Sequence, residues 1–222
     1  MNLSPYLEQT ARWPVKGRHI LAQFNEQSVV VYQAYNEGAG HFAAQNGYFR
    51  VDFSFDRMSW IKPNFLWMMY RSGWATKPNQ TCVLAIRISL DLWEEILSQA
   101  VPSSYVPELY ESEKQWKADV SQSEVRLQWD PDHSPRGGAL ARRAVQLGLR
   151  GSILRRFATT PISIDDITDF VQQQHKIVQT DDWTPLMTPS EQVYEIRNPE
   201  AQRRLGVTEH VREEEQLSRS DL

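Results

Sequence analysis

The sequence predicts an α+β fold in a single domain, with a central, mostly antiparallel sheet and helices packed against it. Three observations lead to this prediction. Strand-like and helix-like segments follow one another from Arg18 to Tyr194 without an internal repeat or a linker. A chain of 222 residues, 41% of them hydrophobic, is long enough to bury a sizeable core as one domain. The segment near residues 63–72 is so apolar that it predicts a fully buried helix.

Strand signals occur in several segments. Residues 19–24 and 29–35 predict two strands separated by a polar turn at 25–28. The second is apolar almost throughout, which is typical of a central strand. Apolar and polar residues alternate over 49–55, as in a strand with one face in solvent. Further strands are expected over 83–88 and 125–129.

Helix signals lie between these strands. Asn36 can cap a helix over 39–45, which Asn46-Gly47 would end. Pro63 suits the first turn of a helix that runs to Arg71 and ends at Ser72-Gly73. The other expected helices cover residues 91–100, the segment opened by the capping box Ser112-Glu113-Lys114-Gln115, 139–149, 152–158 and 165–178.

The two ends of the chain look different from the domain at 18–194. Residues 1–17 predict an irregular arm, because Pro5, Pro14 and Gly17 interrupt any period. Residues 195–222 are polar, which predicts a solvated tail.

Composition limits the function classes. A formal net charge of −4 argues against general coating of nucleic acid. The single cysteine, Cys82, excludes a disulfide framework within the chain and is expected to be a small buried hydrophobe. The first residues lack the apolar core of a signal peptide, and no stretch approaches the roughly 18 apolar residues of a membrane span. The cytoplasm is the expected compartment, and no membrane partner is expected.

The densest group of chemically useful side chains is the block Asp56–Trp74. Aromatic rings beside cations are what a site needs to stack a base and hold its phosphates, so the block suggests a nucleotide-sized ligand. The alternative is a core helix whose end cations reach solvent, and this is favoured for Phe65–Met69. The two interpretations are even at the ends of the block, for Arg57, Ser59, Lys62, Arg71 and Trp74.

A second group, Gln128–His133, holds Asp130, Asp132 and His133. Two carboxylates and an imidazole could serve as general acid and base or bind a hard metal ion. The same residues are also typical of a turn, since Asp before Pro initiates turns. Without a second ligand cluster in the sequence, no metal site is predicted.

A third group is the segment 136–156, which contains six arginines and no acid. A pair of basic helices here could contact RNA or another phosphorylated partner. An ordinary amphipathic helix pair with arginines at its rim is the favoured alternative. The Walker-type, Gly-x-Ser-x-Gly, Cys-x-x-Cys and His-Glu-x-x-His signatures are all absent from the chain.

Several strings resemble a microbial and fungal family catalogued as domain of unknown function 4291. They are Arg18–Phe24, Val30–Asn36, Arg57–Trp74, Val125–His133 and Arg143–Gly151. The resemblance spans about residues 17–195 and implies no established activity.

The order of elements is also faintly similar to the ADP-ribosyltransferases, whose arginine, serine and Gln-x-Glu motifs hold NAD. The matching positions would be Arg18, Ser59 and Gln128-Trp129-Asp130. The departures are Asp130 in place of glutamate, one serine instead of a Ser-Thr-Ser run, and helices after the last motif. This analogy implies that Arg18 grips the pyrophosphate and that Asp130 stabilises charge on the ribose.

The first hypothesis is therefore a nucleotide-handling enzyme with NAD as a possible substrate and ADP-ribosyl transfer as a possible reaction. Its catalytic residues would be Arg18, Ser59 and Asp130, and its ligand-binding residues Gln33, Tyr35, Arg57, Trp60, Lys62, Arg71, Trp74, Gln128 and His133. The alternative is a non-catalytic module that binds RNA or a phosphate ligand through Arg136–Arg156. A third possibility is a structural or protein-interaction role. The sequence leaves the oligomeric state open.

Overall fold

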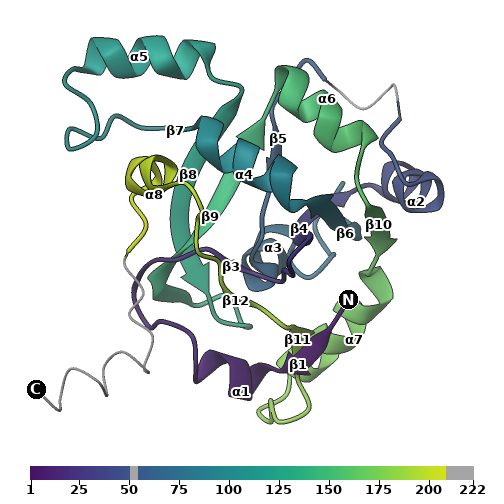
Figure 1. Cartoon of the computed structure of the whole chain (residues 1–222). Helices are drawn as coiled ribbons and strands as arrows, with labels where there is room; N and C mark the ends of the chain where they lie inside the picture. Colours follow the sequence, from purple (N-terminus) through teal and green to yellow (C-terminus); the bar gives the residue numbers. More distant parts are fainter. Residues whose placement is uncertain (51–54, 209–222) are drawn as a thin grey trace, which may run out of the picture.

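The computed structural model describes residues 1–50 and 55–208 and has an α+β architecture (Figure 1). A three-stranded antiparallel sheet has the order β10-β6-β4. Its strands are β4 (Ser28–Tyr35), β6 (Cys82–Ser89) and β10 (Ser163–Asp166). The apolar strand predicted at 29–35 is present but lies beside β6 at the end of this order, so β6 is the central strand.

A five-stranded sheet forms the second layer, with the order β2-β9-β8-β7 and with β5 also paired to β9. Its strands are β2 (Gly17–Arg18), β5 (Ser59–Ile61), β7 (Ala100–Pro102), β8 (Val125–His133) and β9 (Ala139–Leu149). The two longest strands, β8 and β9, pair antiparallel, as does β5 with β9, while β2 and β7 add parallel pairs. The predicted sheet is thus mostly antiparallel but is divided into two larger sheets and two small ones.

Both faces of the three-stranded sheet are buried, because alternate residues of its strands enter two different core clusters. Val29 and Val31 of β4 pack in one cluster with Trp93 and Phe157. Tyr32, from the opposite face, packs in the other cluster with the helix α3. This explains why β4 and β6 are nearly continuous apolar runs.

The helices cover these sheets (Figure 1). They are α2 (Glu37–Asn46), α3 (Phe65–Ser72), α4 (Leu90–Gln99), α5 (Glu113–Gln122), α6 (Gly151–Thr159), α7 (Thr168–Val178) and α8 (Pro199–Leu205). The α5 helix buries none of its residues. No helix in the described part of the chain is long and apolar enough to cross a membrane.

The α3 helix is buried except at its last turn, where Tyr70 and Arg71 are exposed. The Asn64 side chain caps its start by accepting a hydrogen bond from the Trp67 N–H at 2.7 Å. Gly73 ends it in the left-handed conformation, with φ of 61°. The apolar sequence and both end signals therefore agree with the observed helix.

The prediction that residues 1–17 form an irregular arm is wrong. It contains β1 (Leu3–Pro5), which pairs antiparallel with β11 (Met187–Pro189), and α1 (Tyr6–Thr10). Trp13 is buried, and its indole N–H donates to the Glu191 carbonyl at 3.0 Å. A further small sheet joins β3 (Leu21–Ala22) to β12 (Gln192–Val193). The partners of the arm lie about 180 residues later, beyond the reach of local sequence patterns.

Several other expectations need correction. Residues 139–149, predicted as a helix, form strand β9, because pairing with β8 and β5 overrides their helical propensity. β8 continues through Asp130–His133, where a turn was expected, and the turn follows at Ser134–Gly138. The last predicted helix starts at Thr168, after strand β10. The expected strand at 49–55 falls largely outside the described residues.

The expected tail at 195–222 also contains a packed element. Helix α8 buries Ala201 and Leu205 against the main core cluster. Its Asn198 cap and its left-handed Gly206 are ordinary helix end signals. The domain therefore extends beyond Tyr194.

Candidate functional site

A pocket of about 820 Å³ lies where the two larger sheets meet helix α3. It is the size of a small-molecule site. Eight of the twelve predicted site residues line it: Gln33, Tyr35, Arg57, Ser59, Trp60, Lys62, Arg71 and Gln128. The remaining lining residues are Ala34, Asn36, Ala39, Met58, Met68, Asn79, Gln80 and Gln146. The structure thus brings most of the predicted site into one cavity.

Lys62 is the pivotal cation of this pocket. Its side chain is buried, with the whole residue only 4% exposed, and its Nζ donates to the Trp60 carbonyl at 3.4 Å. Among the described residues, no carboxylate forms an ion pair with it. Burial, reinforced by the positive charge of Arg71, lowers the pKa of Lys62 to about 8, while Asp130 acts in the opposite direction. A buried lysine in this state is suited to receive an anion.

Two exposed arginines add positive charge at the rim. Arg71 is placed there by the last turn of α3, and its Nη1 donates to Gln80 Oε1 at 3.4 Å. Arg57 precedes β5 and lines the same cavity. Guanidinium groups match the geometry of phosphate and carboxylate oxygens. The pocket therefore holds three cations around one space.

A hydrogen-bonded group from β4 and β5 forms one wall. The Gln33 side-chain amide donates to Ser59 Oγ at 2.8 Å and to the Trp60 carbonyl at 3.1 Å. The Tyr35 hydroxyl donates to Gln33 Oε1 at 2.8 Å. Burial raises the pKa of Tyr35, so this phenol is neutral at physiological pH. These bonds hold Ser59 and Trp60 in fixed positions.

The opposite wall is formed by two glutamines that face each other on β8 and β9. Gln128 pairs with Gln146 in the strand register. Both donate through Nε2 to the Asp130 carboxylate, at 2.8 Å and 2.7 Å. Each amide uses one N–H in this way, and its oxygen atom can act as an acceptor. Asp130 itself is absent from the cavity lining and positions the two glutamines from behind.

Glycine at position 148 permits close packing beneath the pocket. A Cβ atom at Gly148 would stand 2.3 Å from Met58 Sδ and 3.0 Å from Trp60 Cε2. Only glycine therefore allows both side chains to lie against β9. This contact places the Trp60 ring at the cavity, where an aromatic face can stack on a base.

Arg18 lies away from this pocket. It belongs to β2, and its cavity is a smaller one of about 170 Å³ that includes Trp129 and Leu205. The Trp129 indole N–H donates to the Leu205 carbonyl at 2.8 Å. Gln128 lines this cavity as well as the larger one, whereas Asp130 lines neither of them. Arg18 and Asp130 therefore do not line the same one of these two cavities.

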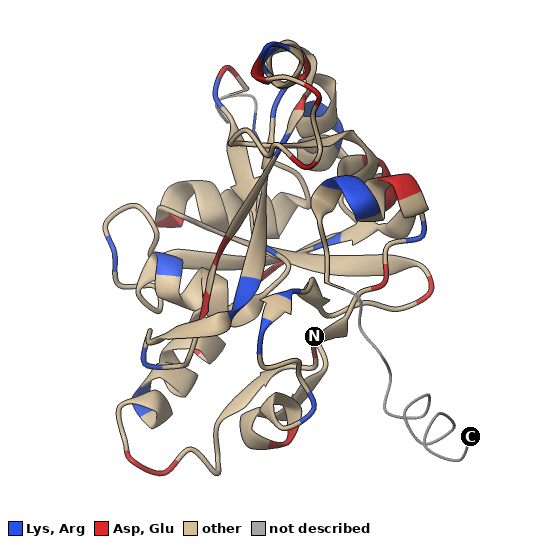
Figure 2. Cartoon of the chain, turned by 90° about the vertical axis from the view of Figure 1, so that its left-hand side faces the viewer, with Lys and Arg blue, Asp and Glu red and all other residues tan. Residues whose placement is uncertain are grey.

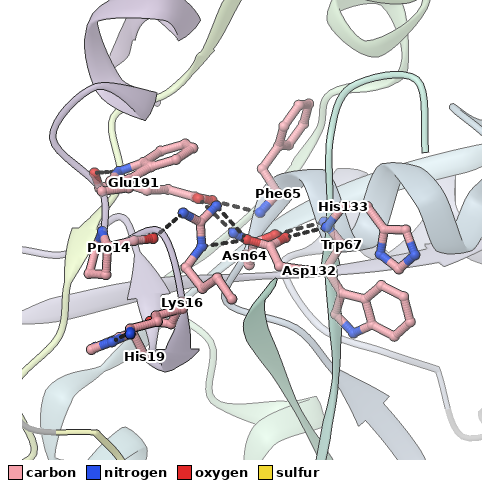
Figure 3. Close-up of polar contacts among 11 residues, drawn as sticks. Pro14, Lys16, His19, Asn64, Phe65, Trp67, Asp132, His133 and Glu191 are labelled. Atoms are coloured by element: carbon pink, nitrogen blue, oxygen red, sulfur yellow. Dashed lines mark hydrogen bonds and ion pairs between the residues drawn. The ribbon is translucent and has the colours of Figure 1, made fainter. Parts of the chain in front are cut away.

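Trp74 and His133 also lie outside the pocket lining. Trp74 donates to the Pro135 carbonyl at 3.1 Å and stacks on His175 with ring centroids 5.5 Å apart. His133 stacks on Trp67 with ring centroids 5.2 Å apart (Figure 3). It also stacks on Tyr70, at 3.5 Å. Burial lowers the pKa of His133, which favours the neutral ring. Both residues fasten the β8–β9 hairpin to α3 and α7.

Asp132, the fully buried acid of segment 128–133, has a structural role. Asp132 forms an ion pair with Arg142 at 2.7 Å and accepts the His133 backbone N–H at 2.7 Å. Arg142 also donates to the Pro14 carbonyl at 2.6 Å. Figure 3 shows Asp132 beside Glu191, which accepts the Phe65 N–H at the start of α3. This cluster joins the N-terminal segment, β8 and α3.

Five of the six arginines of segment 136–156 have internal partners, and Arg143 is exposed. Arg136 pairs with Asp181, Arg142 with Asp132 and Arg156 with Glu95. Arg150 donates to backbone carbonyls, and Arg155 lies over the Phe55 ring. The segment is also a strand followed by a helix rather than a pair of helices. Lysine and arginine are dispersed over the face seen in Figure 2. The expected pair of basic helices is therefore wrong, while RNA binding itself stays a prediction.

Sequence reasoning missed Gln146, Gln80 and Met58 as lining residues. Gln146 was hidden because its segment was assigned to a helix, where it would not face Gln128. Its alternation with buried Val145 and Leu147 is the signal that could have revealed it.

The chain matches one known protein family. Residues 19–194 match the family described as "Domain of unknown function (DUF4291)". Because the match covers well over half of the 222 residues, the chain belongs to this family. No curated protein matches the chain.

Proposed function

We propose that this member of the DUF4291 family is a nucleotide-handling enzyme and that the pocket between the two sheets binds its substrate. The observation that carries the proposal is Lys62, a buried cation without a carboxylate partner among the described residues, flanked by Arg57 and Arg71. Burying a lysine without an anion is costly, and a bound phosphate would remove that cost.

The other walls complement the rest of a nucleotide. The Trp60 ring offers a stacking surface at the cavity. The oxygens of Gln128 and Gln146 can accept hydrogen bonds from ribose hydroxyls or from an exocyclic amino group. A ligand with phosphates, a sugar and an aromatic base uses all three kinds of wall, whereas a bare phosphate uses only the cations.

NAD-dependent transfer of ADP-ribose is the narrower form of this proposal. Ser59 lies in the pocket, but Arg18 does not, so Arg57 and Arg71 would have to hold the pyrophosphate. Asp130 would act through Gln128 and Gln146 rather than on the ribose directly. Release of nicotinamide from NAD, followed by chromatography, tests this form separately from binding.

A thermal-shift panel tests the broader proposal. The purified chain is melted alone and with ATP, ADP, NAD, adenosine, inorganic pyrophosphate and a short single-stranded RNA. A ligand that binds only the native state raises the melting temperature. We expect nucleotides to shift it more than adenosine or pyrophosphate alone. Equal melting temperatures across the panel at saturating concentrations would refute nucleotide binding.

A further inference from the structure

A second group of side chains lies outside the pocket lining. His41 of α2, Cys82 of β6 and Asp166 of β10 present one atom each within 4.8 Å of one another. His41 Nε2 lies 3.5 Å from Asp166 Oδ2, and Cys82 Sγ lies 3.5 Å from the same oxygen. Three elements that are distant in sequence therefore converge on one point.

Two of the three distances between these donor atoms fit tetrahedral coordination, and the third is at most 4.8 Å. Zinc binds nitrogen and oxygen at about 2.0–2.1 Å and thiolate sulfur at about 2.3 Å, which gives ligand-to-ligand edges of roughly 3.3–3.6 Å. The two distances to Asp166 Oδ2 lie in this range. The donor set of imidazole nitrogen, thiolate sulfur and carboxylate oxygen is also one that zinc accepts, whereas magnesium and calcium favour oxygen alone.

The fold orients each of these donors. Thr168 fixes the other oxygen of Asp166, because its backbone N–H and its hydroxyl both donate to Oδ1, at 2.9 Å and 2.5 Å. This leaves Oδ2 directed at His41 and Cys82. Gly40 allows α2 to approach β6, since a Cβ there would stand 2.3 Å from Cys82 Sγ. The His41 side chain is 53% exposed, so water can reach a fourth coordination position.

We infer that His41, Cys82 and Asp166 form a zinc-binding site with one open position. Zinc coordinates the thiolate form of cysteine, so binding would displace the Cys82 thiol proton.

The site adjoins the nucleotide pocket but does not depend on it. Cys82 pairs with Tyr35 in the β4–β6 register, and Tyr35 lines the pocket. Asn36 and Ala39, next to and within α2, line it as well. A zinc ion bound through His41 would therefore fix α2 at the edge of the pocket.

Cobalt titration tests the inference on the full chain. Purified protein is freed of metal with a chelator, the chelator is removed, and Co²⁺ is added while the absorption spectrum is followed. We expect one equivalent to give a thiolate-to-cobalt charge-transfer band with the intense visible bands of tetrahedral cobalt, and Zn²⁺ to abolish both. A spectrum identical to free aqueous Co²⁺ would overturn the inference.

Three variants assign the ligands. Cys82→Ser is expected to remove the charge-transfer band, and His41→Ala to weaken Co²⁺ binding by at least about tenfold. Asp166→Asn keeps an oxygen that can accept from Thr168 and should also weaken binding. Asp165→Asn is the matched control, because Asp165 is the exposed neighbour on the same strand, and its affinity should stay unchanged. A band that persists in folded Cys82→Ser would contradict the assignment. Nucleotide binding is measured separately, by the thermal-shift panel. A failure of the zinc site can therefore be distinguished from a failure of nucleotide binding.

Discussion

Lys62 and Tyr32 are hydrogen-bonded to each other through their backbones in both directions. The Tyr32 N–H donates to the Lys62 carbonyl at 2.7 Å, and the Lys62 N–H donates to the Tyr32 carbonyl at 3.3 Å. This bridge ties the segment after β5 to the outer edge of β4. It holds the lysine between the two larger sheets, where the residue is buried.

Replacing Lys62 should increase the stability of the fold and abolish nucleotide binding. The lowering of the Lys62 pKa from 10.5 to about 8 corresponds to a cost on the order of 3 kcal/mol when the amine is charged. Lys62→Met should therefore raise the free energy of unfolding at pH 7 by about 1–3 kcal/mol while abolishing nucleotide binding. Urea unfolding and calorimetric titration measure the two effects. Lys114→Met on the exposed α5 helix is the control and should change neither. A large loss of stability in Lys62→Met would contradict the proposed role.

The same lysine predicts a pH dependence. Its folded-state pKa lies below its unfolded value, so the cost of burying the charge is fully present below pH 8 and fades as pH rises to 10.5. The stability advantage of Lys62→Met over wild type should shrink across this window. A difference in unfolding free energy that stays constant from pH 7 to pH 10 would indicate that the amine is not buried in its charged form.

The affinity of the pocket for a phosphate-containing ligand should fall over the same pH range. Phosphate binding requires the charged amine, so the dissociation constant for ADP should rise above pH 8, by at most about tenfold per pH unit for one proton. Isothermal titration at several pH values measures this. An unchanged affinity up to pH 10 would exclude Lys62 as a phosphate ligand.

Asp130 is predicted to act through other residues. In Asp130→Asn, an NH2 group replaces one of the two carboxylate oxygens and cannot accept from Gln128 or Gln146, so one amide must turn. We expect nucleotide affinity to fall about threefold to tenfold. The loss of negative charge near Lys62 should also move the pH midpoint of binding to lower values. Asp119→Asn on α5 serves as the control. Unaltered affinity and pH midpoint would show that Asp130 has no positioning role.

Variants of Arg18 and Arg71 test where the nucleotide binds. The ADP-ribosyltransferase analogy placed Arg18 in the site, whereas the pocket is lined by Arg71. Because Arg18 lines a different cavity, Arg18→Ala should leave nucleotide affinity unchanged. Arg71→Ala should weaken it by about tenfold or more, as expected when a charged hydrogen bond to phosphate is lost. The reverse pattern in a titration of both variants would refute the location of the site.

The Arg142–Asp132 pair gives a prediction about folding alone. The two side chains are 5% and 1% exposed, so removal of the arginine leaves a buried carboxylate without its cation. Arg142→Ala should lower the unfolding free energy by about 3–5 kcal/mol. Arg143→Ala, the exposed neighbour on β9, should cost less than about 0.5 kcal/mol. Similar stabilities of the two variants in urea would contradict the structural role of the pair.

Local signals in the sequence were sufficient for much of the fold. The caps of α2 and α3, Asn36 with Gly47 and Asn64 with Gly73, are short-range features and mark these helices correctly. Strand β9 was missed because its arginines and alanines suit a helix, and only pairing with β8 and β5 decides its conformation. The N-terminal segment was missed for the same reason, since Gln9 and Trp13 are held by residues near position 190.

The candidate site was predictable to the extent that it lies in one block of sequence. Arg57, Lys62 and Arg71 flank a buried helix, and the helix brings them to one cavity. Arg18 was selected by analogy with another family, and Trp74 and His133 by composition alone. The packing of Trp74 on His175 and of His133 on Tyr70 depends on tertiary contacts that no local pattern specifies.

Binding of a nucleotide in the Lys62 pocket can be measured by calorimetric titration of ADP into the wild-type chain and into Lys62→Met at pH 7. We expect saturable binding at one site in the wild type and none in a Lys62→Met protein that is at least as stable. Absence of binding to the wild type, or equal affinity in both proteins, would contradict this expectation.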